Sequence, residues 1–236
     1  MLELLHYSKS YDGKLTVKDV NLKVESGEIY GFIGHNGAGK TTTIKSIAGI
    51  LDFEEGDILI YGKSIKKDPL ACKSIMAYIP DNPNLYDGLS GIKYLNFIAD
   101  IYKVDTNRRM ELIDKYSKLF ELDKNLGDSI SSYSHGMKQK LVIIAALIHE
   151  PKLLLLDEPF VGLDPKASHI LKQIMREICD AGGCIFFSTH VLEVAEKLCD
   201  HICIIKKGEI VKDGTVEEVV GDTSLEDVFL ELADHE

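Results

Sequence analysis

The nine residues GHNGAGKTT, Gly34 to Thr42, constrain this chain more than any other stretch. They fit the pattern G-x-x-x-x-G-K-[ST] and lie between an apolar run of strand length, EIYGFI, and a helix-like segment, TTIKSIAGI. In that setting the glycines let successive backbone N–H groups converge on phosphate oxygens, and the helix N-terminus adds its positive dipole end. The pattern predicts a phosphate-binding loop; the alternative is a plain glycine-rich turn.

The loop also predicts roles for its side chains. Lys40 would reach the β and γ phosphates of a nucleotide, and the Thr41 hydroxyl would hold Mg²⁺. We therefore expect the whole loop at the nucleotide, and its residues are Gly34, His35, Asn36, Gly37, Ala38, Gly39, Lys40, Thr41 and Thr42.

A second motif, LLLLDEP, supplies carboxylates for such a site. Its four apolar residues predict a buried strand that delivers Asp157 to the sheet edge, where a carboxylate can hold Mg²⁺ directly or through water. Glu158 follows, and a second charge beside phosphates is hard to explain by packing because it costs solvation and repels the ligand. We interpret Glu158 as the group that orients and polarises an attacking water; the alternative is a solvated charge at a strand end.

Apolar runs of strand length alternate with helix-like segments along the chain. EIYGFI, GDILIYG, SIMAYIP, KLLLLDEP and CIFFSTH are predicted strands, and the last two end in polar residues, where open parallel sheets place ligands. Apolar stripes with helical spacing predict helices around residues 141–148 and 171–178. This alternation predicts an α/β fold with a largely parallel core sheet, and the phosphate-binding loop indicates a P-loop NTPase.

Two parts of the chain depart from that alternation. Val20, Leu22 and Val24 alternate as in a half-exposed strand, which we assign to an N-terminal antiparallel β portion. From about 82 to 125 the pattern is helical with no convincing strand, and we interpret about 82–150 as an inserted helical subdomain. Residues 1–236 are expected to form a single domain.

Composition excludes several classes of function. No apolar run in the 236 residues approaches the ~20 needed to cross a bilayer, and the start, MLELLHYSKSY, has no secretory pattern. A formal net charge of −11 argues against a nucleic-acid binder, which usually relies on basic patches. Five cysteines without a Cys-x-x-Cys pair favour thiols in a reducing compartment. We therefore expect a cytoplasmic protein and no nucleic-acid partner.

The motifs and their order resemble the nucleotide-binding subunit of ABC transporters over nearly the whole chain. GHNGAGKTT is similar to the Walker A motif, SHGM in YSHGMKQK to the ABC signature, and LLLLDEP to Walker B with its adjoining glutamate. VGLDP resembles the D-loop, and FFSTH ends in His190 like the switch histidine of the family. The resemblance implies one ABC ATPase domain, residues 1–236, that binds and hydrolyses ATP with Mg²⁺.

The resemblance also implies a dimer. In the family, two subunits meet head to tail, and the signature of one closes over the ATP on the Walker A motif of the other. Ser134 and Gly136 stand at the start of a predicted helix, so a hydroxyl, backbone N–H groups and the dipole could face a γ-phosphate. A lone Ser-x-Gly before a helix is usually an N-cap, and only its place between Walker A and Asp157 favours the signature.

Three further positions take their meaning from the family. His190 would contact the γ-phosphate and act in catalysis with Glu158 and Lys40, although a histidine after an apolar strand is usually structural. Tyr11 matches the aromatic that stacks on adenine; the alternative is a surface tyrosine. Asp81 stands at the nucleotide where the family usually has glutamine, and its role is open.

The implied function is ATP-driven transport through separate transmembrane permease subunits. These subunits would receive the motion of the ATPase dimer near Asp81 and NPNLYDGLSG, so the chain would be peripheral on the cytoplasmic face of the cell membrane. The motif details are most similar to the exporter branch. A homodimer and a heterodimer both remain open. The alternatives are a soluble ABC ATPase for repair, translation or cofactor assembly, and a P-loop kinase or GTPase, which would leave the signature unexplained.

Overall fold

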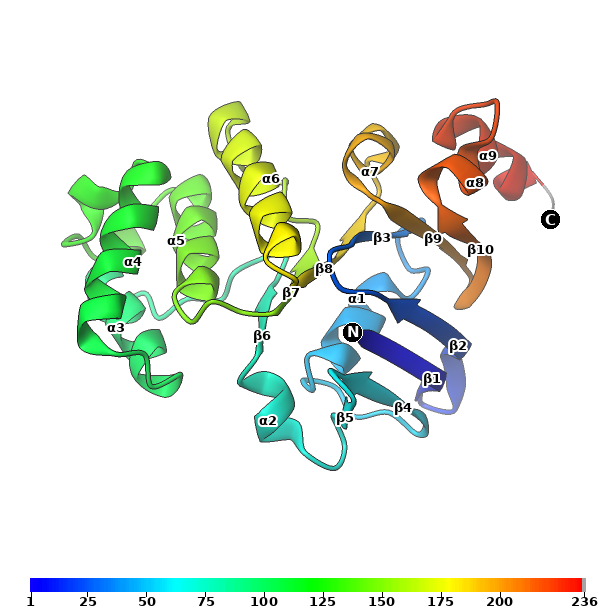
Figure 1. Cartoon of the computed structure of the whole chain (residues 1–236), viewed down its shortest axis with the longest axis horizontal. Helices are drawn as coiled ribbons and strands as arrows, with labels where there is room; N and C mark the ends of the chain where they lie inside the picture. Colours follow the sequence, from blue (N-terminus) through cyan, green and yellow to red (C-terminus); the bar gives the residue numbers. More distant parts are fainter. Residues whose placement is uncertain (235–236) are drawn as a thin grey trace.

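A computed structural model describes residues 1–234, which form two β-sheets and the helices around them (Figure 1). The larger sheet has the strand order β10-β9-β3-β8-β7-β6 and is parallel except for β10, which runs antiparallel to β9. Its strands are β3 (Ile29–Ile33), β6 (Met76–Ile79), β7 (Leu153–Asp157), β8 (Cys184–Thr189), β9 (His201–Lys206) and β10 (Glu209–Thr215). The predicted largely parallel core sheet is confirmed.

The smaller sheet is wholly antiparallel and has the order β2-β1-β4-β5. Its strands are β1 (Leu2–Tyr11), β2 (Lys14–Val24), β4 (Glu55–Ile60) and β5 (Lys63–Ser64). Helix α1 (Lys40–Ile47) joins both sheets, because Ile44 of the helix, Leu4 of β1 and Phe186 of β8 belong to one buried apolar cluster. The antiparallel β portion predicted for the N-terminal region is thus present, and it packs on the helix that follows the phosphate loop.

The strand β7 shows how the parallel sheet is buried on both faces. Leu153 and Leu155 belong to the cluster around α1, whereas Leu154 and Leu156 belong to a second cluster on the opposite face. This division follows from the two-residue period of a strand, and it explains why β7 is a continuous apolar run. The second cluster joins the sheet to α5 (His135–Leu147) and α6 (Pro165–Asp180).

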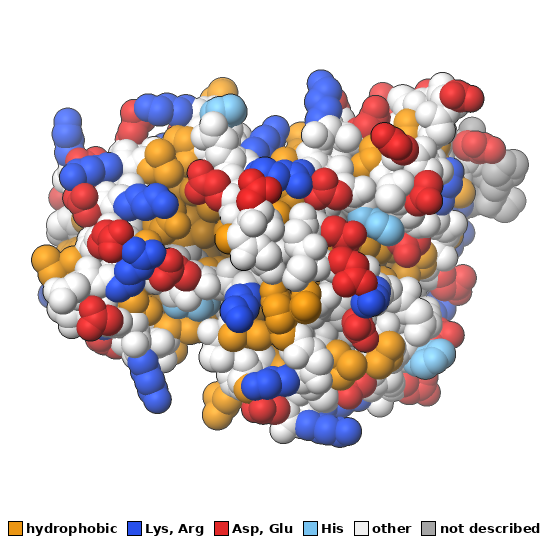
Figure 2. Space-filling model, viewed as in Figure 1, with side chains coloured by type: hydrophobic (Ala, Val, Ile, Leu, Met, Phe, Trp, Pro, Cys, Tyr) orange, Lys and Arg blue, Asp and Glu red, His pale blue; other side chains and the backbone are white. Residues whose placement is uncertain are grey.

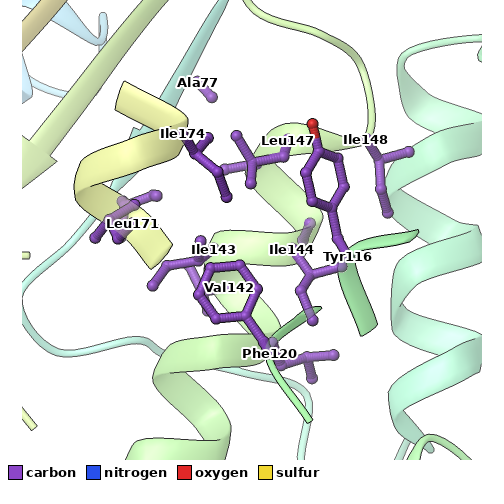
Figure 3. Packing of buried hydrophobic residues seen from close by; sticks show 14 of the residues in the cluster. Ala77, Tyr116, Phe120, Val142, Ile143, Ile144, Leu147, Ile148, Leu171 and Ile174 are labelled. Carbon is purple, nitrogen blue, oxygen red and sulfur yellow. The ribbon is translucent and has the colours of Figure 1, made fainter. Parts of the chain in front are cut away.

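Figure 3 shows the packing of α5 within that cluster. Ile143 and Leu147 of α5 lie near Leu171 and Ile174 of α6. Tyr116 and Phe120 approach α5 from another side. Two further helices, α3 (Gly91–Ile101) and α4 (Thr106–Leu119), and two short 3₁₀ turns, η1 (Asp123–Asn125) and η2 (Ile130–Ser132), lie between β6 and α5. The predicted helical insertion is confirmed, and its helices form one end of the molecule (green in Figure 1). The division of 1–236 into domains stays a prediction.

The chain after β8 adds elements that the sequence patterns did not predict. Strands β9 and β10 extend the sheet, and α7 (Leu192–Leu198), α8 (Val216–Val220) and α9 (Leu225–Asp234) gather beside them. A short helix, α2 (Pro69–Lys73), lies near β5. Among residues 1–234, no helix combines the length and the apolar content that a membrane span requires. On the face shown in Figure 2, basic and acidic side chains are interspersed and form no continuous basic patch.

Candidate functional site

The loop from Gly34 to Gly39 connects the carboxyl end of β3 to α1 and leaves that helix open at its N-terminus. Gly39 is the N-cap residue, and within the described part of the chain no side chain caps the helix and no acidic residue lies in its first turn. The free N–H groups of a first helical turn and the helix dipole together favour an anion. The loop predicted from the sequence therefore has the geometry of a phosphate cradle.

Two glycines of the loop are required by its shape. A Cβ atom on Gly34 would lie 2.5 Å from the carbonyl oxygen of Ile205 on β9, so the loop can run this close to the sheet only with glycine. Gly39 has a φ of 111°, in the region that favours glycine. These positions set the path of the backbone that would surround a phosphate.

The ammonium group of Lys40 folds back over the loop. Its Nζ donates hydrogen bonds to the carbonyl oxygens of Gly34 (2.6 Å) and His35 (3.3 Å), and the residue is only 7% exposed. Burial lowers the pKa of Lys40, and the charges of Glu158 and Asp157 oppose that shift. The nearest carboxylate is Glu158, with Oε1 at 3.9 Å from Nζ, so an anion in the loop would give this buried cation a closer partner.

Asp157 ends β7 and is almost wholly buried, with 2% exposure. Its Oδ1 accepts a hydrogen bond of 2.5 Å from the Ser188 hydroxyl, and Ser188 pairs with Asp157 in the register of β7 and β8. No Lys, Arg or His within the described residues forms an ion pair with this carboxylate. A buried carboxylate without a cation suits a metal ligand.

Glu158 and His190 meet because they follow the neighbouring strands β7 and β8. Nδ1 of His190 lies 2.9 Å from Oε1 of Glu158, and the His190 backbone N–H donates to Oε2 at 3.4 Å. Glu158 has a φ of 49°, in the left-handed region that costs a non-glycine residue about 1–2 kcal/mol. Such backbone strain is concentrated at functional sites, where the surrounding structure maintains it.

A cavity of about 230 Å³ brings Lys40, Asp157 and Glu158 together, whereas His190 is not among its lining residues. Its lining residues are Thr16, His35, Asn36, Gly37, Gly39, Lys40, Thr41, Thr42, Asp81, Asp157 and Glu158. Most of the predicted loop therefore faces one space with all three predicted carboxylates. Thr41 and Asp157 fit Mg²⁺ there, because proteins usually hold this ion through one or two carboxylates, a hydroxyl and the phosphates of a bound nucleotide.

Comparison with known proteins identifies the family. The family model for ABC transporters matches residues 17–161, more than half of the chain. This chain belongs to the ABC transporter family. EcsA of Bacillus subtilis, an ABC-type transporter ATP-binding protein, is 36% identical to this ABC protein over 98% of the chain and 96% of its own length.

Two further comparisons support the assignment. The Nod factor export ATP-binding protein I of Cupriavidus metallidurans is 30% identical over 93% of the chain and 73% of its own length. A solved structure of the ATP-binding subunit of an ABC transporter superposes with a TM-score of 0.95 at 35% identity, covering 99% of this chain and all of the other. The chain is thus an ABC ATPase, an ATP-binding subunit with the P-loop NTPase fold.

The segment that resembles the ABC signature lies outside the cavity that contains the loop. Ser134 is the N-cap of α5, and its hydroxyl accepts a 3.2 Å hydrogen bond from the backbone N–H of Met137. Gly136 faces the segment that resembles the D-loop, since a Cβ there would lie 3.0 Å from the carbonyl oxygen of Gly162. Neither Ser134 nor Gly136 lines the cavity around Lys40.

Tyr11, expected to stack on adenine, ends β1 and is 44% exposed. The ammonium of Lys9 lies 5.2 Å from its ring centroid, in the range of a cation–π contact. The ring is absent from the lining of the cavity, so its role at adenine stays a prediction. Gly34 and Ala38 also belong to the loop without lining the cavity.

Sequence reasoning missed three residues that bear on the site. Thr16 of β2 lines the cavity, Ser188 holds Asp157, and Phe229 of α9 contacts His35. The only local signal was the position of Ser188 in FFSTH, two residues before His190. The other two residues reach the site from distant parts of the chain, through packing that no local pattern encodes.

Proposed function

We propose that two copies of this chain bind two MgATP molecules head to tail, with the signature of each copy covering the triphosphate on the loop of the other. One observation carries the proposal. The loop and the carboxylates share one cavity, while Ser134 and Gly136 stand at the start of a different helix, outside that cavity. The exposed N-terminus of α5 offers a second anion-binding end that a partner's phosphate could occupy.

We assign the roles within each site from the contacts described above. Lys40 and the backbone of the loop bind the phosphates, and Thr41 and Asp157 hold Mg²⁺, which supplies positive charge when it is bound. Glu158 orients the attacking water through a carboxylate oxygen. His190 binds Glu158 through Nδ1, which leaves Nε2 to donate to the γ-phosphate.

The motion of the dimer would drive separate transmembrane subunits, and we propose that the transport is export. We propose that these subunits dock at the segment 82–91. An exposed aromatic pair supports this role: Tyr86 is 61% exposed and packs edge-on against the half-exposed Phe97, with the ring centroids 6.0 Å apart. A relative named for Nod factor export supports the direction. The chain would then lie on the cytoplasmic face of the membrane.

A substitution of Glu158 tests the dimer. Glu158→Gln keeps the size of the side chain and removes its charge, so we expect it to bind MgATP, to lose turnover and to run as a stable dimer in size-exclusion chromatography with MgATP. Lys40→Ala is the matched control and should neither bind nor dimerise. A Glu158→Gln protein that stays monomeric with saturating MgATP contradicts the head-to-tail dimer.

Purification from detergent-solubilised membranes distinguishes transport from the soluble alternative. An integral membrane protein that copurifies with the tagged chain supports transport. Copurification of ribosomes or DNA in place of a membrane protein would favour a soluble ABC ATPase for translation or repair.

A further inference from the structure

The last helix of the chain contacts the phosphate loop. The ring of Phe229 on α9 lies 4.6 Å from the ring of His35, centroid to centroid, with 52° between the ring planes. This separation is within the range of favourable aromatic pairs. The contact joins the C-terminal helix to the loop that precedes α1, so two segments from opposite ends of the chain meet at the site.

Helix α9 is held in place independently of that contact. The backbone N–H of Leu225 donates to Glu196 of α7 at 2.9 Å, and Lys206 of β9 donates to the carbonyl oxygen of Leu232 at 2.6 Å. Leu225 and Val228 are buried in a cluster that includes Ile204 of β9. Phe229 is therefore presented to the loop from a helix that is anchored to α7 at its first residue and to β9 near its other end.

His35 is the residue through which such a contact can act on the loop. Its carbonyl oxygen accepts hydrogen bonds from the backbone N–H of Ala38 (3.1 Å) and from Nζ of Lys40 (3.3 Å). The side chain is exposed and lies between the nucleotide cavity and a second cavity of about 320 Å³, which Ile205 and Lys206 also line. Without Phe229, the ring of His35 would lose the aromatic contact that orders it.

We propose that Phe229 is a positioning residue for nucleotide binding. Its ring holds His35 in place, and the carbonyl oxygen of His35 in turn holds Ala38 and Lys40 of the loop in the conformation that accepts phosphate. This inference rests on the proposed nucleotide site. A loop that is ordered before binding loses less conformational entropy when the ligand arrives. The C-terminal helix is thereby part of the nucleotide site without contacting the nucleotide.

Nucleotide affinity in a series of Phe229 variants tests the role. The probe is ATP with a fluorescent ribose label, in the presence of Mg²⁺. Phe229→Leu removes the ring but keeps apolar bulk, so the Kd should rise about two- to tenfold, the range expected for loss of an aromatic pair. Phe229→Tyr retains the ring and should restore an affinity near wild type. Leu230→Ala, at an exposed neighbouring position of α9, is the control and should not change the Kd.

A double-mutant cycle separates positioning from general loss of packing. His35→Ala removes the other ring at an exposed loop position, so it tests the proposal even if a Phe229 variant fails to fold. We expect His35→Ala to raise the Kd by a similar factor, and Phe229→Leu to have no further effect in the His35→Ala background. Equal effects of Phe229→Leu in both backgrounds would overturn the proposal, and so would a His35→Ala protein with wild-type affinity.

The same measurements separate this inference from the proposed function. A wild-type protein that does not bind the MgATP probe would refute the nucleotide site itself. A wild-type protein that binds the probe, with Phe229→Leu and His35→Ala binding equally well, would refute only the positioning role of Phe229.

Discussion

His190 and Glu158 are in direct contact, with Nδ1 of the histidine 2.9 Å from Oε1 of the glutamate. The contact exists because β7 and β8 are parallel neighbours, so the residues that follow their carboxyl ends meet at one edge of the sheet. Lys40 approaches the same carboxylate oxygen from α1, at 3.9 Å. Glu158 thus lies between His190 and Lys40, and these two contacts fix the direction of its carboxylate.

Loss of the His190 ring should slow hydrolysis without preventing binding. His190→Ala leaves the loop and Lys40 intact and removes one proposed hydrogen bond to the γ-phosphate, so we expect the Kd for MgATP to rise only about two- to tenfold. It also frees Glu158 to rotate, and kcat should fall about a hundredfold, the scale of a misplaced general base. Steady-state phosphate release and equilibrium nucleotide binding measure the two quantities. His169→Ala, at an exposed position of α6, should change neither. A fall in affinity equal to the fall in kcat would contradict this assignment.

Two inactive variants should complement each other if the site is shared. Ser134→Asp keeps an N-cap on α5 but places negative charge where a partner's γ-phosphate would lie, and Lys40→Ala removes the phosphate-binding ammonium. When the two are coexpressed in equal amounts, each mixed dimer carries one intact site. Activity should therefore return to about a quarter of wild type if the chains pair at random, and to about half if only mixed dimers form. Coexpressed chains as inactive as each variant alone would mean that the signature acts within its own chain.

The elements that could be predicted from the sequence are those whose pattern is local. The run 153–156 predicts β7 and the stripe 171–178 predicts α6, because each lies within one element and is buried on a defined face. Strand β1 was harder to recognise because it has several register shifts against β2, and His6 has a φ of 51°. Its alternation is broken, so the two-residue period is lost.

Most of the residues that line the cavity were named from local motifs, but their arrangement could not be predicted. The loop and Asp157 have strong motifs, whereas the pairing of Glu158 with His190 depends on β7 lying next to β8. The contact of Phe229 with His35 depends on how α9 packs against β9. These relations follow from strand order and tertiary packing, which patterns of local sequence do not determine.

Nucleotide affinity should depend on alkaline pH through Lys40. Burial lowers the pKa of Lys40 below its ordinary value of 10.5, against the opposing charges of Glu158 and Asp157. A triphosphate favours the protonated ammonium, so affinity is fully present below the lowered pKa and is lost as the pH rises through it. Lys40 has the opposite effect on the stability of the nucleotide-free protein. The unfolded chain binds the proton more tightly than the folded protein does, so the contribution of Lys40 to the free energy of unfolding rises with pH between its lowered pKa and 10.5.

Binding measured from neutral pH to pH 10.5 checks that dependence. The Kd for MgATP should begin to rise below pH 10.5 in the wild-type protein. Lys40→Arg is the control, because its guanidinium stays protonated throughout and its residual affinity should not show this alkaline loss. A wild-type Kd that is constant over the whole range would show that deprotonation of Lys40 does not limit binding.

Gly34 should not tolerate a methyl group. A Cβ at this position would lie 2.5 Å from the carbonyl oxygen of Ile205, and backbone cannot move aside as a flexible side chain can. Gly34→Ala must therefore displace the loop from β9, which should lower the free energy of unfolding by about 1–3 kcal/mol in urea denaturation, as for other overpacked sites. MgATP affinity should fall as well, because the Gly34 carbonyl is the closest acceptor for Lys40. Gly88→Ala, where a Cβ meets open space, should change stability by less than about 0.5 kcal/mol. If Gly34→Ala matches this control in both stability and affinity, close contact with β9 does not shape the loop.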